Sequence, residues 1–124
     1  MKGITITTDN VISIVNVESN GTPLYRQMNA VVGGYYENVY PQRLPKGFVM
    51  VVNEESKLKN LPINEAGSYL YGSDAHGDYI AGNVIILKLG YYEGEPDVIG
   101  MSDDEAIEIM KDLLNNVKAL KGAN

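Results

Sequence analysis

Residues 80–89 read Ile80-Ala81-Gly82-Asn83-Val84-Ile85-Ile86-Leu87-Lys88-Leu89 and form the longest strand pattern of the chain. Aliphatic and β-branched residues dominate this run, and only the Gly82-Asn83 step interrupts it, so the sequence predicts a long strand here. Phe48–Val52 is a second run without a polar residue, which is typical of a central strand covered on both faces. These two runs predict that a β-sheet forms the centre of the fold.

Further strands are expected on both sides of Phe48–Val52 and at the start of the chain. Ile4–Thr7 alternates apolar and polar residues, and the Asp9-Asn10 turn pair separates it from the β-branched run Val11–Val17. This pattern predicts an N-terminal hairpin. Tyr35–Tyr40 is the remaining strand candidate, and it ends at Pro41.

Helices are predicted between these strands. Thr22 is suited to cap a helix, with Pro23 at the first helical position, where its missing N–H costs nothing. The Gly33-Gly34 pair is expected to end that helix. Ile63–Tyr71 is a candidate for a second, short helix, which Gly67 weakens.

The last predicted helix opens at Ser102, which forms a capping box with Glu105. One apolar stripe follows along it, made of Ile107, Met110, Leu113, Leu114, Val117 and Leu120. Before this helix, Gly90–Gly100 is interpreted as an acidic, tyrosine-bearing loop. The tail Lys121–Asn124 is expected either to fray or to lead into a further segment.

The order of these elements predicts one α+β domain over residues 1–124. It is a mainly antiparallel sheet with two or three helices, the C-terminal one packed on the sheet. A chain of 124 residues can bury a core without disulfides, and the absence of cysteine excludes disulfides and thiolate chemistry. The N-terminus enters a strand pattern directly and no long apolar run follows, so we expect neither secretion nor membrane association.

The chain is acidic, with 16 Asp and Glu against 10 Lys and Arg and a formal net charge of -6. Such a balance disfavours DNA binding, which needs a basic face. It still allows a small anion to bind, because backbone N–H groups can hold a phosphate. The nine tyrosines suit core packing or stacking on a base.

His76 is the sole histidine and lies in a glycine-rich segment before the long strand. It is interpreted as a turn residue or as a ligand contact. Catalysis would require a partner carboxylate and a nucleophile, and a metal site would require more ligands at fixed geometry. The Gly82-Asn83 step offers an amide donor and acceptor to a ligand, or marks a β-bulge.

The two arginines, Arg26 and Arg43, are candidates for phosphate contacts, because a planar guanidinium binds phosphate through two bonds; ordinary surface roles are the alternative. Lys57 and Lys59 form a third basic spot. The acidic pairs of the chain lack the spacing of a calcium loop, so we expect no metal site and no cofactor.

Several segments also carry a family resemblance through their order and spacing. They are Lys2–Asn10, Val31–Glu37, Val51–Glu55, Leu58–Asn64, Tyr69–Gly72 and Gly82–Ile86. On these segments the chain resembles a family of small phage and prophage proteins that includes the Thoeris anti-defence proteins.

The resemblance implies a protein that sequesters, without degrading, a cyclic ADP-ribose isomer made by a bacterial TIR enzyme. It implies action in the cytoplasm of the infected host as a homodimer or higher homo-oligomer, and some members also take up cyclic oligonucleotides at separate sites. No enzymatic activity is expected. The ligand-binding residues expected for this chain are Tyr79, Gly82, Asn83, Tyr92, Met101, Arg26, Arg43 and His76.

Two other functions remain as alternatives. An acidic antirestriction protein that mimics DNA and binds a host defence enzyme would carry carboxylates spaced like phosphates along one face, whereas this sequence scatters its acids over turns and one helix end. A phosphodiesterase would need a metal cluster or a pair of histidines.

Overall fold

The computed structural model describes residues 1–17 and 23–123. Its elements in chain order are β1 (Lys2–Ile6), β2 (Val11–Asn16), α1 (Leu24–Val32), β3 (Tyr36–Val39), β4 (Phe48–Asn53), α2 (Glu65–Tyr71), α3 (Ser73–His76), β5 (Val84–Tyr92), β6 (Glu95–Ile99), α4 (Asp103–Asn116) and β7 (Lys121–Gly122). The strands form one sheet in the order β3-β4-β5-β1-β2-β7, and β6 pairs with the far end of β5. Every pairing is antiparallel except that of β2 with β7.

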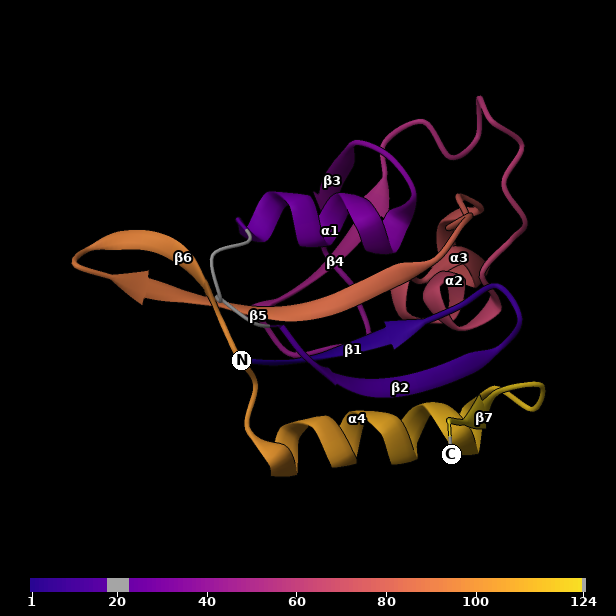
Figure 1. Ribbon diagram of the computed structural model, residues 1–124. Coiled ribbons are helices and arrows are strands. Elements are labelled where there is room, and N and C mark those ends of the chain that lie inside the picture. The colour runs from indigo at the N-terminus through magenta and orange to yellow at the C-terminus, as the bar shows by residue number, and fades with distance from the viewer. Residues whose placement is uncertain (18–22, 124) are drawn as a thin grey trace.

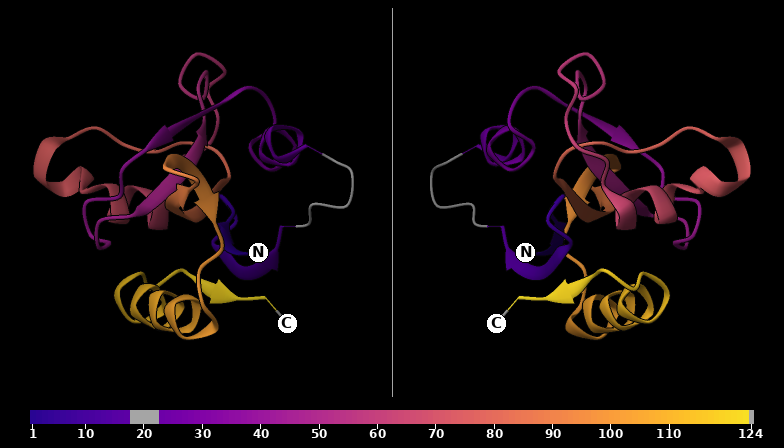
Figure 2. Two further views of the ribbon diagram at one scale, coloured as in Figure 1. Left: turned by 90° about the vertical axis from the view of Figure 1, so that its left-hand side faces the viewer. Right: turned by 90° about the vertical axis from the view of Figure 1, so that its right-hand side faces the viewer.

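The helices cover both faces of this sheet, with α1 on one side and α4 on the other (Figure 1). Figure 2 shows α2 and α3 beside the sheet and apart from α1, and α2 contributes Ala66 and Leu70 to the same core as α4. The predicted α+β class is therefore confirmed, including a C-terminal helix packed on the sheet.

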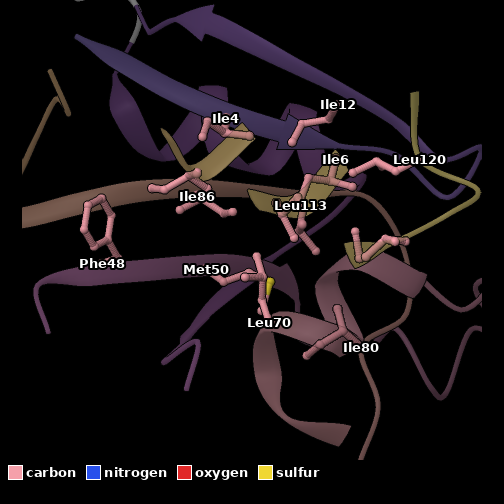
Figure 3. Packing of buried hydrophobic residues seen from close by; sticks show 14 of the residues in the cluster. Ile4, Ile6, Ile12, Phe48, Met50, Leu70, Ile80, Ile86, Leu113 and Leu120 are labelled. Atoms are coloured by element: carbon pink, nitrogen blue, oxygen red, sulfur yellow. The ribbon is translucent and has the colours of Figure 1, made fainter. Parts of the chain in front are cut away.

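The strand β4 is buried at all six positions, which confirms the prediction of a central strand covered on both faces. Its alternate side chains belong to two separate cores. Val49 and Val51 pack on the α1 side, and Met50 and Val52 pack on the side of α2 and α4. The larger core also gathers Leu113 of α4 (Figure 3).

The helix α4 begins with the predicted capping box. The Ser102 Oγ accepts from the Glu105 N–H at 3.1 Å, and the Glu105 carboxylate accepts from the Ser102 N–H at 2.9 Å. The predicted apolar stripe was wrong in part, because Ile107 and Leu114 are exposed by 44% and 37%. Leu113, Val117 and Leu120 of the stripe are buried as predicted, and the buried face of the helix also includes Ala106 and Ile109.

Three boundaries differ from the prediction. Residues 90–100 are not a loop, since β5 continues to Tyr92 and turns through Glu93 and Gly94, both with positive φ, into β6. Lys121 and Gly122 do not fray, because they form β7 and pair with β2. The short helix α2 starts after its N-cap Asn64 rather than at Ile63.

The predicted ends of the first helix are confirmed in part. Pro23 is the N-cap of α1 rather than its first helical residue, while Thr22 and Asn124 lie outside the described residues. Gly33, with φ of 79°, ends α1 as predicted. No helix in the described part of the chain is long and apolar enough to cross a membrane.

Candidate functional site

The segment between α2 and β5 carries several of the residues that sequence analysis selected, and a buried amide fixes its end. Asn64, which is fully buried, donates from Nδ2 to the carbonyl oxygens of Ile6 and Gly82, both at 3.0 Å. Its Oδ1 accepts from the Gly67 N–H at 2.9 Å. One side chain therefore joins the end of β1, the start of α2 and the Gly82-Asn83 step.

Two hollows lie on either side of this segment. The first, which we call the Tyr79 cleft, has a volume of about 150 Å³. It is lined by Glu37, Val39, Val52, Glu54, Ser56, Lys57, Leu58, Tyr71, Asp78, Tyr79, Ile80 and Ala81. The second, which we call the Asn83 hollow, has a volume of about 360 Å³. It is lined by Thr8, Ala30, Val31, Val32, Gly33, Asn53, Lys59, Leu61, Pro62, Gly82 and Asn83.

The Tyr79 cleft has an acidic lining. Glu37, Glu54 and Asp78 face a single base, Lys57, whose ammonium bonds to the Asp78 carboxylate and lies 4.7 Å from the centroid of the Tyr79 ring. The hydrogen bond from Lys57 lowers the pKa of Asp78, and the same bond raises the pKa of Lys57. This excess of carboxylates disfavours an anionic ligand.

The Asn83 hollow has the opposite character. Lys59 is the only charged residue of its lining among the residues described. The Asn83 Oδ1 accepts from the Thr8 N–H at 3.0 Å, which orients its Nδ2 as a donor. The Lys59 ammonium is held only loosely, 3.8 Å from the Glu55 carboxylate. The ammonium lies close to Gly34, where a Cβ would come within 3.2 Å of Nζ.

Arg43 is committed to partners within the chain. Its guanidinium makes two bonds of 2.8 Å to the Asp74 carboxylate, donates to the Tyr69 carbonyl and lies 4.4 Å from the centroid of the Tyr69 ring. The bond to Asp74 raises the pKa of Arg43, and it lowers the pKa of the Asp74 carboxyl. A phosphate at Arg43 would have to displace Asp74.

His76 is the last residue of α3 and is tied to its neighbours. Its Nε2 lies 2.9 Å from the Tyr71 carbonyl oxygen, and its Nδ1 accepts from the Asp78 N–H at 3.2 Å. The His76 and Tyr71 rings meet edge to face, with their centroids 5.0 Å apart. His76 therefore lies beside the Tyr79 cleft, where it orders the turn that carries Asp78.

The remaining predicted residues are dispersed. Arg26 is exposed on α1, 6.0 Å from the centroid of the Tyr25 ring, and Met101 is buried in the larger core. Tyr92 ends β5, and its side chain lies outside the part of the structure that is described. The structure thus brings Gly82 and Asn83 into one hollow and places Tyr79 in the other. Arg26 is not among the residues that line either of them, although it lies one helical turn before Ala30, which lines the Asn83 hollow.

Sequence reasoning missed Thr8 and Asn53, which line the Asn83 hollow, and Asn64, which supports it. The sequence did contain one indication of the role of Asn64, since an asparagine directly before a predicted short helix is a common N-cap. The sequence contained no such indication for Thr8, because its place in the hollow depends on the pairing of β1 with β5. Within residues 1–17 and 23–123, no group of three or more acidic or histidine side chains is arranged to hold a metal ion.

The comparison with protein families gives one match. Residues 1–114 match the family described as a domain of unknown function, DUF3846, and the chain therefore belongs to that family. No curated protein and no solved structure matches the chain.

Proposed function

We propose that this member of the DUF3846 family binds a TIR-produced cyclic ADP-ribose isomer and sequesters it without degrading it. This is the role of Thoeris anti-defence protein one, which the chain resembles. One observation carries the proposal: all residues that line the Asn83 hollow, except Ala30, belong to the segments on which the resemblance rests. Segments far apart in the sequence thus converge on one hollow.

The chemistry of the hollow suits a pyrophosphate. Lys59, the Thr8 hydroxyl and the Asn83 amide supply a cation and neutral donors, and charge-assisted hydrogen bonds of this kind are the stronger ones in proteins. Val31, Leu61 and Pro62 provide apolar wall for the rest of the ligand. The volume of about 360 Å³ falls within the range of small-molecule sites.

Sequestration requires tight binding but no reaction. To compete with a receptor of about micromolar affinity, the protein needs roughly nanomolar affinity, near -12 kcal/mol. His76, the residue type most often used for proton transfer, is hydrogen-bonded to backbone groups beside the other cleft. This placement favours binding over turnover. The proposed place of action is the host cytoplasm, where the TIR enzyme makes the signal.

The first experiment is recovery of intact ligand. The protein is mixed with the cyclic ADP-ribose isomer from an activated TIR enzyme, unbound material is removed, and the protein is denatured by heat. Release of the unchanged molecule supports sequestration. A linear product would identify an enzyme, and no depletion of the ligand would reject it as the partner.

A pair of lysine variants tests whether the ligand binds in the Asn83 hollow. Lys59→Gln should weaken binding by roughly 10- to 100-fold, the effect of losing one charge-assisted bond of about 1.5–3 kcal/mol. Lys57→Gln is the matched control, since Lys57 lines the Tyr79 cleft. Equal losses in the two variants would contradict the assignment, as would a larger loss for Lys57→Gln.

The alternative of a DNA mimic gains no support from the charge arrangement. Several exposed acids are paired with bases of the same chain, among them Asp74 with Arg43, Asp78 with Lys57 and Asp103 with Lys2. A surface that imitates a phosphate backbone would present such carboxylates unpaired to its partner.

A further inference from the structure

The Tyr79 cleft takes no part in the proposed function, and it already holds one cationic side chain. The ammonium of Lys57 bonds to the Asp78 carboxylate and lies 4.7 Å from the centroid of the Tyr79 ring. The face of a tyrosine ring attracts cations, and a neighbouring carboxylate adds to that attraction. The contacts of Lys57 therefore show how this cleft binds a positively charged side chain.

Two more carboxylates line the cleft without a base of their own. In the described part of the chain, neither Glu37 nor Glu54 forms an ion pair. The Glu54 N–H donates to the Tyr35 oxygen at 3.0 Å, and Glu37 lies opposite Val52 in the register of β3 and β4. The two glutamates are therefore diagonal neighbours on one face of the sheet, with Cβ atoms about 7 Å apart. A cation between them would relieve the repulsion of two like charges.

The size of the cleft and its rim indicate a single side chain as the occupant. The volume of about 150 Å³ is below the range of about 300–1,000 Å³ that is usual for whole small-molecule ligands. Leu58, which also lines the cleft, is exposed by 85% and belongs to the segment between β4 and α2 that projects from the sheet (Figure 1). An apolar rim of this kind excludes water from an anchoring side chain at the centre of a protein interface.

We propose that the Tyr79 cleft receives an arginine side chain of a different protein, whose guanidinium bridges Glu37 and Glu54. A guanidinium has N–H donors along the edges of one plane, so it can bond two carboxylates at once. The ammonium of a lysine is a more strongly hydrated point charge and suits this task less well. The alkyl stem of the arginine packs on Val39, and an apolar neighbour in the partner covers Leu58.

Lys57 sets how many carboxylates are left for the arginine. Its bond to Asp78 neutralises that carboxylate, so Glu37 and Glu54 remain for the partner. Removal of the lysine charge would add Asp78 to the free carboxylates and should strengthen the binding of a guanidinium. The proposal does not depend on nucleotide binding, because no residue lines both the Tyr79 cleft and the Asn83 hollow.

Titration with short peptides, followed by NMR, tests the choice of occupant. The peptide acetyl-Leu-Arg-Leu-amide should shift the ring signals of Tyr71 and Tyr79 and bind at least tenfold more tightly than acetyl-Leu-Gln-Leu-amide. The corresponding lysine peptide should fall between them. Equal binding of the arginine and glutamine peptides, or no binding of either, would overturn the proposal. Agmatine supplies a guanidinium without a peptide, and its binding as tightly as the arginine peptide would assign the cleft to a small molecule instead.

Charge variants test the position of the site. Glu37→Gln combined with Glu54→Gln should raise the dissociation constant of the arginine peptide tenfold or more. Glu65→Gln combined with Glu108→Gln is the matched control, since these two exposed glutamates do not line the cleft. Equal affinities of the two double variants would overturn the proposal. So would sedimentation that shows self-association of the wild type and its loss in the first double variant, because a second copy would then occupy the cleft.

The lysine variants separate this proposal from the proposed function. Lys57→Gln should bind the arginine peptide more tightly than the wild type, and Lys59→Gln should bind it equally well. For the cyclic nucleotide, Lys59→Gln is the variant that should bind more weakly. Weaker binding of the arginine peptide by Lys59→Gln than by Lys57→Gln and the wild type would overturn the assignment to the Tyr79 cleft and leave the nucleotide experiment unaffected.

Discussion

Replacing Asn64 by alanine should destabilise the chain strongly, because this one side chain holds three segments together. The substitution removes two donated bonds, to Ile6 and Gly82, and one accepted bond, from Gly67. All are buried, so water cannot replace them. At a net value of about 1 kcal/mol for each bond, the expected loss in the free energy of unfolding is about 3 kcal/mol.

The variant Asn64→Asp distinguishes the two bonds that Asn64 donates from the one that it accepts, because it removes only the donors. Aspartate keeps the oxygen that accepts from Gly67 and still serves as an N-cap, but it sets a carboxylate against two carbonyl oxygens. Burial without a donor raises the pKa of a carboxyl, so this variant should lose stability as pH rises above about 4. We expect it to be less stable than Asn64→Ala at neutral pH and closer to it in acid.

Urea unfolding followed by circular dichroism measures the free energy of unfolding of Asn64→Ala and that of Asn64→Asp at each pH. Asn115→Ala, at an exposed position of α4, is the control and should change stability by less than about 0.5 kcal/mol. A loss below about 1 kcal/mol for Asn64→Ala would refute the argument, because three buried bonds cannot together contribute so little. Equal stability of Asn64→Asp and wild type at neutral pH would refute it as well.

The remaining predictions concern a turn, a cap and an ion pair. Gly82→Ala should cost about 2 kcal/mol and Gly77→Ala about 1 kcal/mol in urea unfolding, since both residues have positive φ but a Cβ at Gly82 would also lie 2.9 Å from Leu61. Equal losses would show that Leu61 moves aside freely. Ser102→Ala should cost about 1 kcal/mol in the same assay, the usual value of an N-cap, and a loss near zero would contradict a role for the capping box. Because its ion pair lowers the pKa of Asp78, the stability that this pair provides is present above about pH 4 and lost as pH falls below it. Asp78→Asn should therefore flatten the acid side of a plot of stability against pH, and an unchanged slope would contradict this.

Local patterns were sufficient for much of the fold. The hairpin of β1 and β2, the buried strand β4 and the capping box of α4 each depend on residues close together in sequence, and each was predicted correctly. The hairpin of β5 and β6 was missed because its turn, Glu93-Gly94, places a glutamate at positive φ, which is uncommon for that residue. The tail was missed because β7 depends on β2, which lies about a hundred residues earlier in the chain.

The site was harder to predict because it depends on contacts between distant segments. The Gly82-Asn83 step was selected from its place before an apolar strand, and it does line a hollow. Arg43 was selected because its guanidinium suits phosphate, but residue type alone cannot show that Asp74 already occupies it. Thr8 reaches the hollow only because β1 lies beside β5 in the sheet.

The pairing of charges bears on how an acidic chain would hold the proposed anionic ligand. Lys2, Arg43, Lys57 and Lys88 all lie within 3 Å of a carboxylate of their own chain. These pairs neutralise bases and acids alike, so neither contributes a strong local field to a ligand. Lys59, with its longer contact of 3.8 Å, is the base in this group of ion pairs that a ligand could take over at the lowest cost. It lies at the hollow whose described lining contains no carboxylate. The proposed anion site therefore depends on a weakly paired base in a hollow without carboxylates, and not on the net charge of the chain.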